Sequence, residues 1–368
     1  MEMERGRETE KERRKRVRAS GAVVPSSKKE DSARTPAAQE RLARLVAEAN
    51  EAWERRAAEA KGEPKVDHYA LQASQFPDTW NRLWFGYFGS FDDTTKIKPS
   101  RFTDEPPPPY SASACRTLQI FSVKVIGIRD GLQWPLQVFG MVALRDSVDH
   151  NRNIIFQRTR DNCQTLTEKD PCLALTGPVR AVVSLDPVTF EVKLTVKGTT
   201  ESDDKDLSAL AVPLLCNPDK SCSLKIDYTS KLSALGLTYG HLRSSVEASI
   251  SVLVSSGASL GRVQCVASTA SIDEEEAILL DSADGEAPVT GDGVIKLSRH
   301  VVSVEVNGKL KVSVLAWRQG DNKAVKKWKE FTPKRADRSH GMLNFVFCRM
   351  KVTVDWSLIT IDASRCGS

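Results

Sequence analysis

From Cys115 onward the chain consists of short runs in which apolar and polar residues alternate, and this pattern constrains the fold most. The first run, Leu118 to Gly127, is rich in β-branched residues, as strands are. Similar runs follow at Leu136 to Leu144, Asn153 to Gln157, Arg180 to Leu185, Phe190 to Val196, Leu224 to Tyr228, Val246 to Val254, Arg262 to Ala267, Ala277 to Leu280, Val301 to Val306, Lys309 to Ala316 and Phe345 to Val354. About a dozen runs with almost no helical pattern between them predict a mostly β chain, with antiparallel sheets packed as a β-sandwich or partial barrel.

Turn residues between these runs support antiparallel pairing. Asn307 and Gly308 separate two alternating runs, which predicts a hairpin, and Leu185 to Val188 predicts another tight reversal. Asp and Pro residues interrupt the pattern from Ser202 to Ser223, as a link between two sub-domains or a long surface loop would. We expect one β domain over residues 115–362, followed by a short tail at 363–368.

The first 62 residues are rich in Arg, Lys, Glu and Ala and contain no Ile or Phe. Such a segment buries too little apolar surface to offset the entropy of ordering it, so residues 1–35 are expected to be a disordered basic tail. Six cations cluster within it: Lys11, Arg13, Arg14, Lys15, Arg16 and Arg18. The cluster fits nuclear import or contact with phosphates, and a solvated tail is the simpler interpretation.

Residues 36–62 show a helical pattern with one narrow apolar stripe. The stripe recurs at steps of three and four residues: Leu42, Leu45, Val46, Ala49 and Trp53. Pro36 fits the first helical position, and Gly62 marks the end. An amphipathic helix is expected here, docked on the β domain or on a partner helix.

Residues 63–114 form an aromatic and Pro-rich extension. Between Phe76 and Phe91 lies a dense aromatic group, expected to pack against the main domain or, alternatively, to stack on a base or sugar ring. Further on, the run Pro107, Pro108, Pro109, Tyr110 fits the Pro-Pro-x-Tyr ligand of WW domains. The same prolines would also make a stiff spacer.

Composition narrows the classes of function. No run approaches the roughly 20 apolar residues needed to cross a bilayer, and no secretory signal pattern follows Met1. The sequence contains no Asn-x-Ser/Thr site, and its eight Cys are scattered. These features predict a protein of the cytoplasm or nucleus that does not act at membranes. A net charge of +5 is mild for 368 residues, so the placement of the charges matters more than their sum.

Asp146, Asp149 and His150 lie within five residues and are the candidate catalytic group, because paired carboxylates beside an imidazole can act as acid and base or hold a metal. Arg145 and Arg152 flank them and offer ion pairs that would satisfy the acids without a metal. Cys216 and Cys222 lack the spacing of a zinc site, and no phosphate-binding Gly-rich motif occurs. We expect neither a metal nor a cofactor.

A second basic stretch mixes cations with aromatic residues, as single-strand nucleic-acid surfaces do. Its members are Lys323, Lys326, Lys327, Trp328, Lys329, Phe331, Lys334, Arg335 and Arg338. It is a candidate RNA-binding segment. The alternative is a solvated connecting loop between two strands, with Trp328 packed inward.

Several stretches together resemble a known family. They are Leu118 to Val125, Trp134 to Gly140, Arg145 to Asn153, Leu175 to Ala181, Ser271 to Ile272, Ile278 to Leu280, Lys296 to Arg299 and Val352 to Ser357. In this order they are similar to a plant family, expanded in grasses, defined by Domain of Unknown Function 6598. The resemblance covers most of Tyr110 to Asp362 and implies no activity.

Some grass relatives in that family resemble fusions to ribosome-inactivating domains. Their chemistry needs a Glu and an Arg three residues apart on one helix face. Between Cys115 and Ser368 no Glu has an Arg three positions on, so the chain is not expected to be an rRNA N-glycosylase by itself.

Together these patterns predict a non-catalytic interaction or scaffold module with a protein partner; a role in stress or defence is suggested by the resemblance alone. The alternatives are an RNA-binding protein that uses residues 11–18 and 323–338, and a hydrolase with its site at Asp146, Asp149 and His150.

Overall fold

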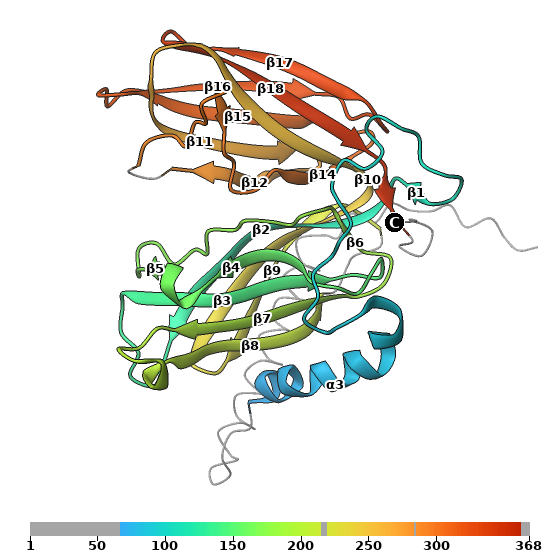
Figure 1. Ribbon diagram of the computed structural model, residues 1–368, viewed down its shortest axis with the longest axis vertical. Coiled ribbons are helices and arrows are strands. Elements are labelled where there is room, and N and C mark those ends of the chain that lie inside the picture. Colours follow the sequence, from blue (N-terminus) through green and yellow to red (C-terminus); the bar gives the residue numbers. More distant parts are fainter. Residues whose placement is uncertain (1–66, 215–218, 283–284, 362–368) are drawn as a thin grey trace, which may run out of the picture. The chain divides into compact units, whose positions relative to one another are not determined.

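A computed structural model describes residues 67–214, 219–282 and 285–361. The disordered tail predicted for residues 1–35, its basic cluster, the helix predicted for 36–62 and the tail at 363–368 lie outside these ranges. The described chain holds one α-helix and many strands, and all pairings between its named strands are antiparallel (Figure 1). The sheets form no closed barrel within these residues. The prediction of a mostly β fold with antiparallel sheets is therefore confirmed.

One layer is a five-stranded sheet in the order β4-β3-β7-β8, with β5 paired to β3. Its strands are β3 (Leu136–Arg145), β4 (Asn153–Arg158), β5 (Gln164–Leu166), β7 (Val188–Val196) and β8 (Lys205–Leu214). Alternate residues such as Val142, Phe190 and Leu210 are fully or almost fully buried, which explains the period of two in the sequence. They share one hydrophobic cluster with Val123 and Leu237 of the facing strands.

Strand β10 (Ser233–Gly257) connects two regions of the fold. Its first half pairs with β2 (Cys115–Ile128) and β9 (Cys222–Ser230). Its second half pairs with β13 (Val294–Ile295), β14 (Val301–Glu305) and β18 (Cys348–Ser357). At 25 residues it is far longer than a typical strand, and bulges interrupt its register.

The second half of β10 faces a four-stranded sheet in the order β12-β11-β15-β16. The strands are β11 (Leu260–Thr269), β12 (Ile272–Asp281), β15 (Leu310–Arg318) and β16 (Ala324–Phe331). A second hydrophobic cluster joins Val252, Cys265, Val314, Val352 and Trp356. Strand β17 (Arg338–Asn344) pairs with β18 at the edge of its own sheet, so β16 and β17 each end a sheet.

Helix α3 (His68–Phe88) contains most of the predicted aromatic group and packs against β8 (Figure 1). Asp67 caps its first turn, and Gly89 ends it with a φ of 89°. Trp80 is 2% exposed, as the packing interpretation expects, but Phe85 and Tyr87 are largely exposed. No helix in the described residues is long and apolar enough to span a membrane.

Three local predictions were wrong. Asn307 and Gly308 do not close a hairpin, because β14 pairs with β10 while β15 crosses to the facing sheet and pairs with β11. The stretch 202–223 is not simply a loop: β8 occupies Lys205–Leu214, where small apolar residues pair with β7. The basic segment contains strand β16, and Trp328 is 54% exposed instead of packed inward. The boundaries proposed for the β domain stay predictions.

Candidate functional site

Asp146 and Asp149 lie in the loop after β3, where both side chains are buried. Arg180 donates to Asp146 from Nη1 and Nη2 over 2.7 and 2.8 Å, and its Nη2 lies 3.0 Å from an oxygen of Asp149. The backbone amide of Val183 donates to Asp146, and the hydroxyl of Thr95 donates to Asp149. The two acids therefore already accept several hydrogen bonds each, and one buried guanidinium pairs with both of them.

The flanking arginines form no ion pair with Asp146 or Asp149 in the described residues, contrary to the sequence-based expectation. Arg145 and Arg152 both pair with Glu191 of β7, each at 2.7 Å, and Arg152 also pairs with Asp92 at 2.6 Å. The guanidinium of Arg145 lies 4.3 Å from the centre of the Phe91 ring. This second ionic group joins the segment after α3 to the five-stranded sheet.

His150 faces helix α3. Its ring stacks on Trp84 with centroids 3.8 Å apart, while its backbone oxygen accepts hydrogen bonds from the side chains of Trp80 and Arg145. Burial lowers the pKa of His150, and the nearby charges of Asp146 and Asp149 only partly oppose this. The imidazole thus stacks on the helix while the two carboxylates bond Arg180, which favours a structural role for the group.

Sequence reasoning missed Arg180, Glu191 and Glu247. Glu247 of β10 is buried, and its carboxylate accepts backbone amides from Ser100 and Ala181, each over 2.6 Å. Burial raises the pKa of this carboxyl group. No local spacing could have indicated these contacts, because the partners are 31 to 147 residues apart.

The Pro-rich motif ends in a turn. Ser111 donates to the oxygen of Pro108 from its amide and from its hydroxyl, over 3.2 and 2.8 Å. Tyr110 has a φ of 65° and is 85% exposed. Pro107, Pro108 and Pro109 lie before it, and Pro109 and Tyr110 both belong to the turn. The tyrosine is accessible, but a partner that needs an extended ligand would have to open this turn.

Strand β16 carries the centre of the predicted basic segment, and most of its side chains are exposed. Lys323, Lys326, Lys327 and Lys329 form no ion pair within the described residues. Trp328 lies among them, and Lys311 of β15 places its Nζ 5.1 Å from the Trp328 ring centre. Of the remaining cations, Lys334 pairs with Asp337 at 2.8 Å, while Arg335 is exposed and has no ion pair in the described ranges.

Alternation along β16 sorts these side chains by face. Lys326 and Trp328 share the outer face of the four-stranded sheet, opposite Leu315 and Ser313 of β15. Lys327 and Lys329 share the other side with the buried Phe331, at the open edge beside β17. The structure therefore brings one exposed ring and several free cations together on a single edge strand. We call Lys311, Lys326, Lys327, Trp328 and Lys329 the β16 surface.

No group of three or more His, Cys, Asp and Glu in the described residues is placed to hold an ion. Cys163, Cys172 and Cys222 are free and half-buried, and Cys216 lies outside the described ranges.

Comparison with known proteins places the chain in a family but not in a functional class. Human group IVD cytosolic phospholipase A2, in complex with methyl gamma-linolenyl fluorophosphonate, is 11% identical, with a TM-score of 0.24; the match covers 67% of this chain and 33% of the phospholipase. The paired C2 domains of extended-synaptotagmin 2 are 8% identical, with a TM-score of 0.23, and the match covers 73% of this chain and 100% of that one. These likenesses are too low to carry an argument.

A search of curated proteins found no match. A family model, the Domain of unknown function (DUF6598), matches residues 117–354. The match spans well over half of the chain and agrees with the sequence resemblance, so the chain belongs to the DUF6598 family.

Proposed function

We propose that this protein is a non-catalytic binding module that holds single-stranded RNA across the β16 surface. The observation that carries the proposal is the 54% exposure of Trp328 among lysines that have no acidic partner in the described chain. A base that stacks on the exposed part of this ring would bury apolar area that now faces water. The lysines supply the phosphate contacts that such a strand needs.

The arrangement at Asp146 supports a binding role over hydrolysis. A hydrolase would need at least one carboxylate free to accept a proton from substrate or water. Here Arg180 and backbone amides occupy both acids, and His150 is stacked on Trp84. RNA as the partner is also compatible with the expected cytoplasmic or nuclear location, which stays a prediction.

The test is binding of the purified full chain to a labelled single-stranded RNA of mixed sequence, followed by fluorescence anisotropy at several salt concentrations. We expect affinity to fall steeply with salt in the wild type. Changing Lys326, Lys327 and Lys329 to Glu should abolish most binding and flatten the salt dependence. Trp328→Ala should weaken binding by about tenfold and leave the salt slope as it was, because the ring stacks but carries no charge.

The matched control changes Lys169, Lys193 and Lys205 to Glu. All three are exposed and lie away from β16, and the net charge moves by the same amount, from +5 to −1. This variant should bind RNA nearly as well as the wild type. Equal loss in both triple variants would mean that only net charge matters. A salt-resistant protein partner without RNA binding would overturn the proposal in favour of a protein scaffold.

A further inference from the structure

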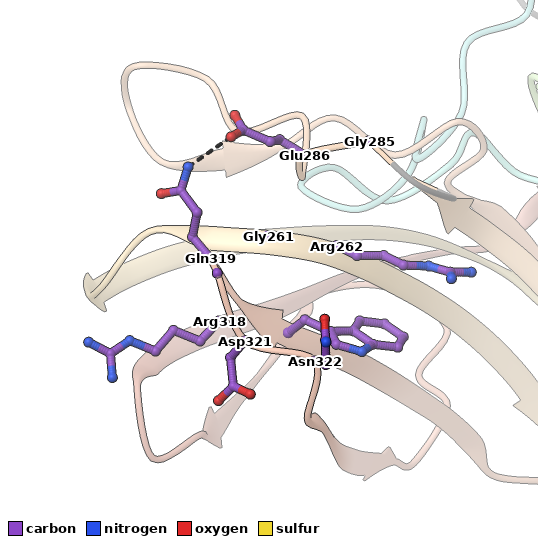
Figure 2. A pocket seen from close by; sticks show the side chains of 10 residues that line it. Gly261, Arg262, Gly285, Glu286, Arg318, Gln319, Asp321 and Asn322 are labelled. Atoms are coloured by element: carbon purple, nitrogen blue, oxygen red, sulfur yellow. Dashed lines mark hydrogen bonds between the residues drawn. The ribbon is translucent and has the colours of Figure 1, made fainter.

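A hollow of about 450 Å³ lies at the end of the four-stranded sheet, beside the turn from β15 to β16. Its lining comes from the start of β11, from residues 285–286 and from the turn (Figure 2). Its polar and aromatic lining includes Arg262, Glu286, Trp317, Gln319, Asp321 and Asn322. Its volume is in the range of small-molecule sites.

Local backbone features open the hollow. The register of β11 against β15 shifts between Leu260 and Val263, and this bulge contains Arg262. Bulges re-aim side chains in this way. Across the next strand pair, Trp317 faces Ala324, a residue too small to cover an indole. Gly320 has a φ of 79° and no neighbour where a Cβ would stand, so the turn leaves open space.

The floor is formed by the guanidinium of Arg262 and the ring of Trp317. The guanidinium of Arg262 lies 5.0 Å from the centre of the Trp317 ring, and its Nη2 bonds to Asp281 at 3.1 Å. Aromatic rings and guanidinium planes are surfaces on which proteins stack unpaired bases. The ion pair with Asp281 holds the guanidinium in place.

The rim offers both donors and acceptors of hydrogen bonds, and its two carboxylates are acceptors only. Glu286 accepts from the side-chain amide of Gln319 at 2.8 Å, and Asp321 accepts from the backbone amide of Lys323 at 2.9 Å. In each case the hydrogen bond engages one of the two carboxylate oxygens. Figure 2 shows Asp321 and Asn322 side by side on the turn, below the Gln319 to Glu286 bridge. The lining carries two arginines against two acids, and the two carboxylates can accept hydrogen bonds from the N–H donors of a ligand.

We propose that this hollow holds one unpaired guanine base of the RNA, an inference that rests on the proposed function. Guanine presents two adjacent donors, N1–H and the 2-amino group, which carboxylate oxygens accept together; adenine and the pyrimidines present no such pair. The site also lies on the path of the RNA. Trp317, Lys326 and Trp328 share the outer sheet face, because Trp317 pairs with Ala324, Leu315 with Lys326 and Ser313 with Trp328. A base in the hollow would leave its phosphates beside Lys326.

The experiment compares two labelled RNAs of about twelve nucleotides, an all-uridine strand and the same strand with one central guanosine, on the full chain at fixed salt. The wild type should bind the guanosine strand at least about tenfold more tightly, the worth of one good two-point base contact. A strand with one central adenosine should gain little. Free guanosine, which lacks a phosphate, should compete with the guanosine strand and quench tryptophan fluorescence.

Asp321→Asn is the main variant, because Asp321 is exposed in a turn and its change should not affect folding. It should remove the preference for guanosine and keep the binding of the all-uridine strand. Asp161→Asn, an exposed acid elsewhere, is the matched control and should keep the preference. Trp317→Ala should lose both the preference and the quenching by guanosine.

Failure of the inference and failure of the proposed function give different results. Binding of both strands with equal affinity, and no binding of guanosine, would overturn the guanine site and leave RNA binding at β16 intact. Binding of guanosine without binding of either strand would overturn RNA binding and support the hollow alone. Equal preference in wild type and Asp321→Asn would overturn the role given to the carboxylate.

Discussion

Arg180 and Asp146 form a two-point ion pair in which the guanidinium is 3% exposed and the carboxylate 0%. Nη1 and Nη2 each donate to a different carboxylate oxygen, over 2.7 and 2.8 Å. The surrounding contacts raise the pKa of Arg180 against the strong effect of burial, so the side chain stays charged. Since Thr95 and Asp149 also contact Arg180, this pair fixes the segment after α3 to the β sheets.

Replacing Arg180 with Met should destabilise the fold by about 3–5 kcal/mol, because two buried carboxylates would lose their only cationic partner among the described residues. The free energy of unfolding in urea measures the effect. Arg338→Met is the matched control: Arg338 also makes a two-point pair, with Asp104, but both side chains are largely exposed. We expect little change there. Equal losses in the two variants would contradict the importance of burial.

Asp67 should stabilise helix α3 through both of its oxygens. Oδ1 accepts from the amide of Ala70 at 2.9 Å, and Oδ2 accepts from the amide of Lys231 in the turn between β9 and β10. Burial alone would raise the pKa of Asp67, but these amides outweigh it and lower the pKa. The stabilisation is therefore present above the ordinary value of 3.8 and is lost as the pH falls through the folded pKa.

Asp67→Ala should cost about 1 kcal/mol or more at pH 7, the usual worth of a helix cap plus the contact with the turn. Asp67→Asn should lose less, because it keeps one oxygen as an acceptor for the cap. Thermal melts followed by circular dichroism at 222 nm would measure both. A melt of Asp67→Ala that matches the wild type would show that α3 does not depend on this cap.

Acidification should weaken the packing of α3 through His150. Its pKa is lowered from 6.5 by burial, so the folded protein favours the neutral ring. The stabilisation is complete above pH 6.5 and is lost as the pH falls through the folded pKa. The urea midpoint of the wild type should drop between pH 7.5 and 5.5, and His150→Gln should show a smaller drop. His241 and His300, whose pKa values burial also lowers, contribute to both proteins equally.

His340 on β17 provides the control for this experiment, because it is exposed. His340→Gln should keep the full drop of the wild type. A second readout is the emission of Trp84, which stacks on the His150 ring at 3.8 Å and should change over the same pH range. An identical drop in wild type and His150→Gln would show that His150 is not responsible.

Local patterns predicted the strands well, because burial on one face imposes a period of two on the sequence. β3, β4, β7, β11 and β15 lie where alternating runs predicted them. The partners of those strands could not be derived in the same way. Asn307 and Gly308 specify a reversal, but whether β15 pairs with β14 or crosses to the other sheet depends on side chains far away in sequence. β16 was missed because six of its eight positions are exposed, including all five from Lys326 to Glu330, so no alternation marks it.

The candidate sites show the same limit. The sequence indicated Asp146 and Asp149 as a group and indicated that arginines would satisfy them. The sequence pointed to Arg145 and Arg152, which are close to the acids along the chain. In the fold, Arg180 pairs with Asp146, while Arg145 and Arg152 pair with Glu191. Trp317 and Arg262 are 55 residues apart and meet only through a bulge. Contacts of this kind follow from pairing register, which a single sequence does not specify.

The lysines of β16 should also protect the sheet edge from aggregation. β16 ends its sheet, and such edges invite pairing with another chain unless charged side chains, especially lysine, prevent it. Changing Lys326, Lys327 and Lys329 to Val should therefore favour the strand conformation and yet produce oligomers, seen by size-exclusion chromatography with light scattering. The change to Glu keeps a charge at each position and should leave the protein monodisperse. These two variants separate the roles: both should lose RNA, but only the Val variant should associate. If the Val variant elutes as the wild type does, edge protection is not why the lysines are there, and ligand contact is left as their main role.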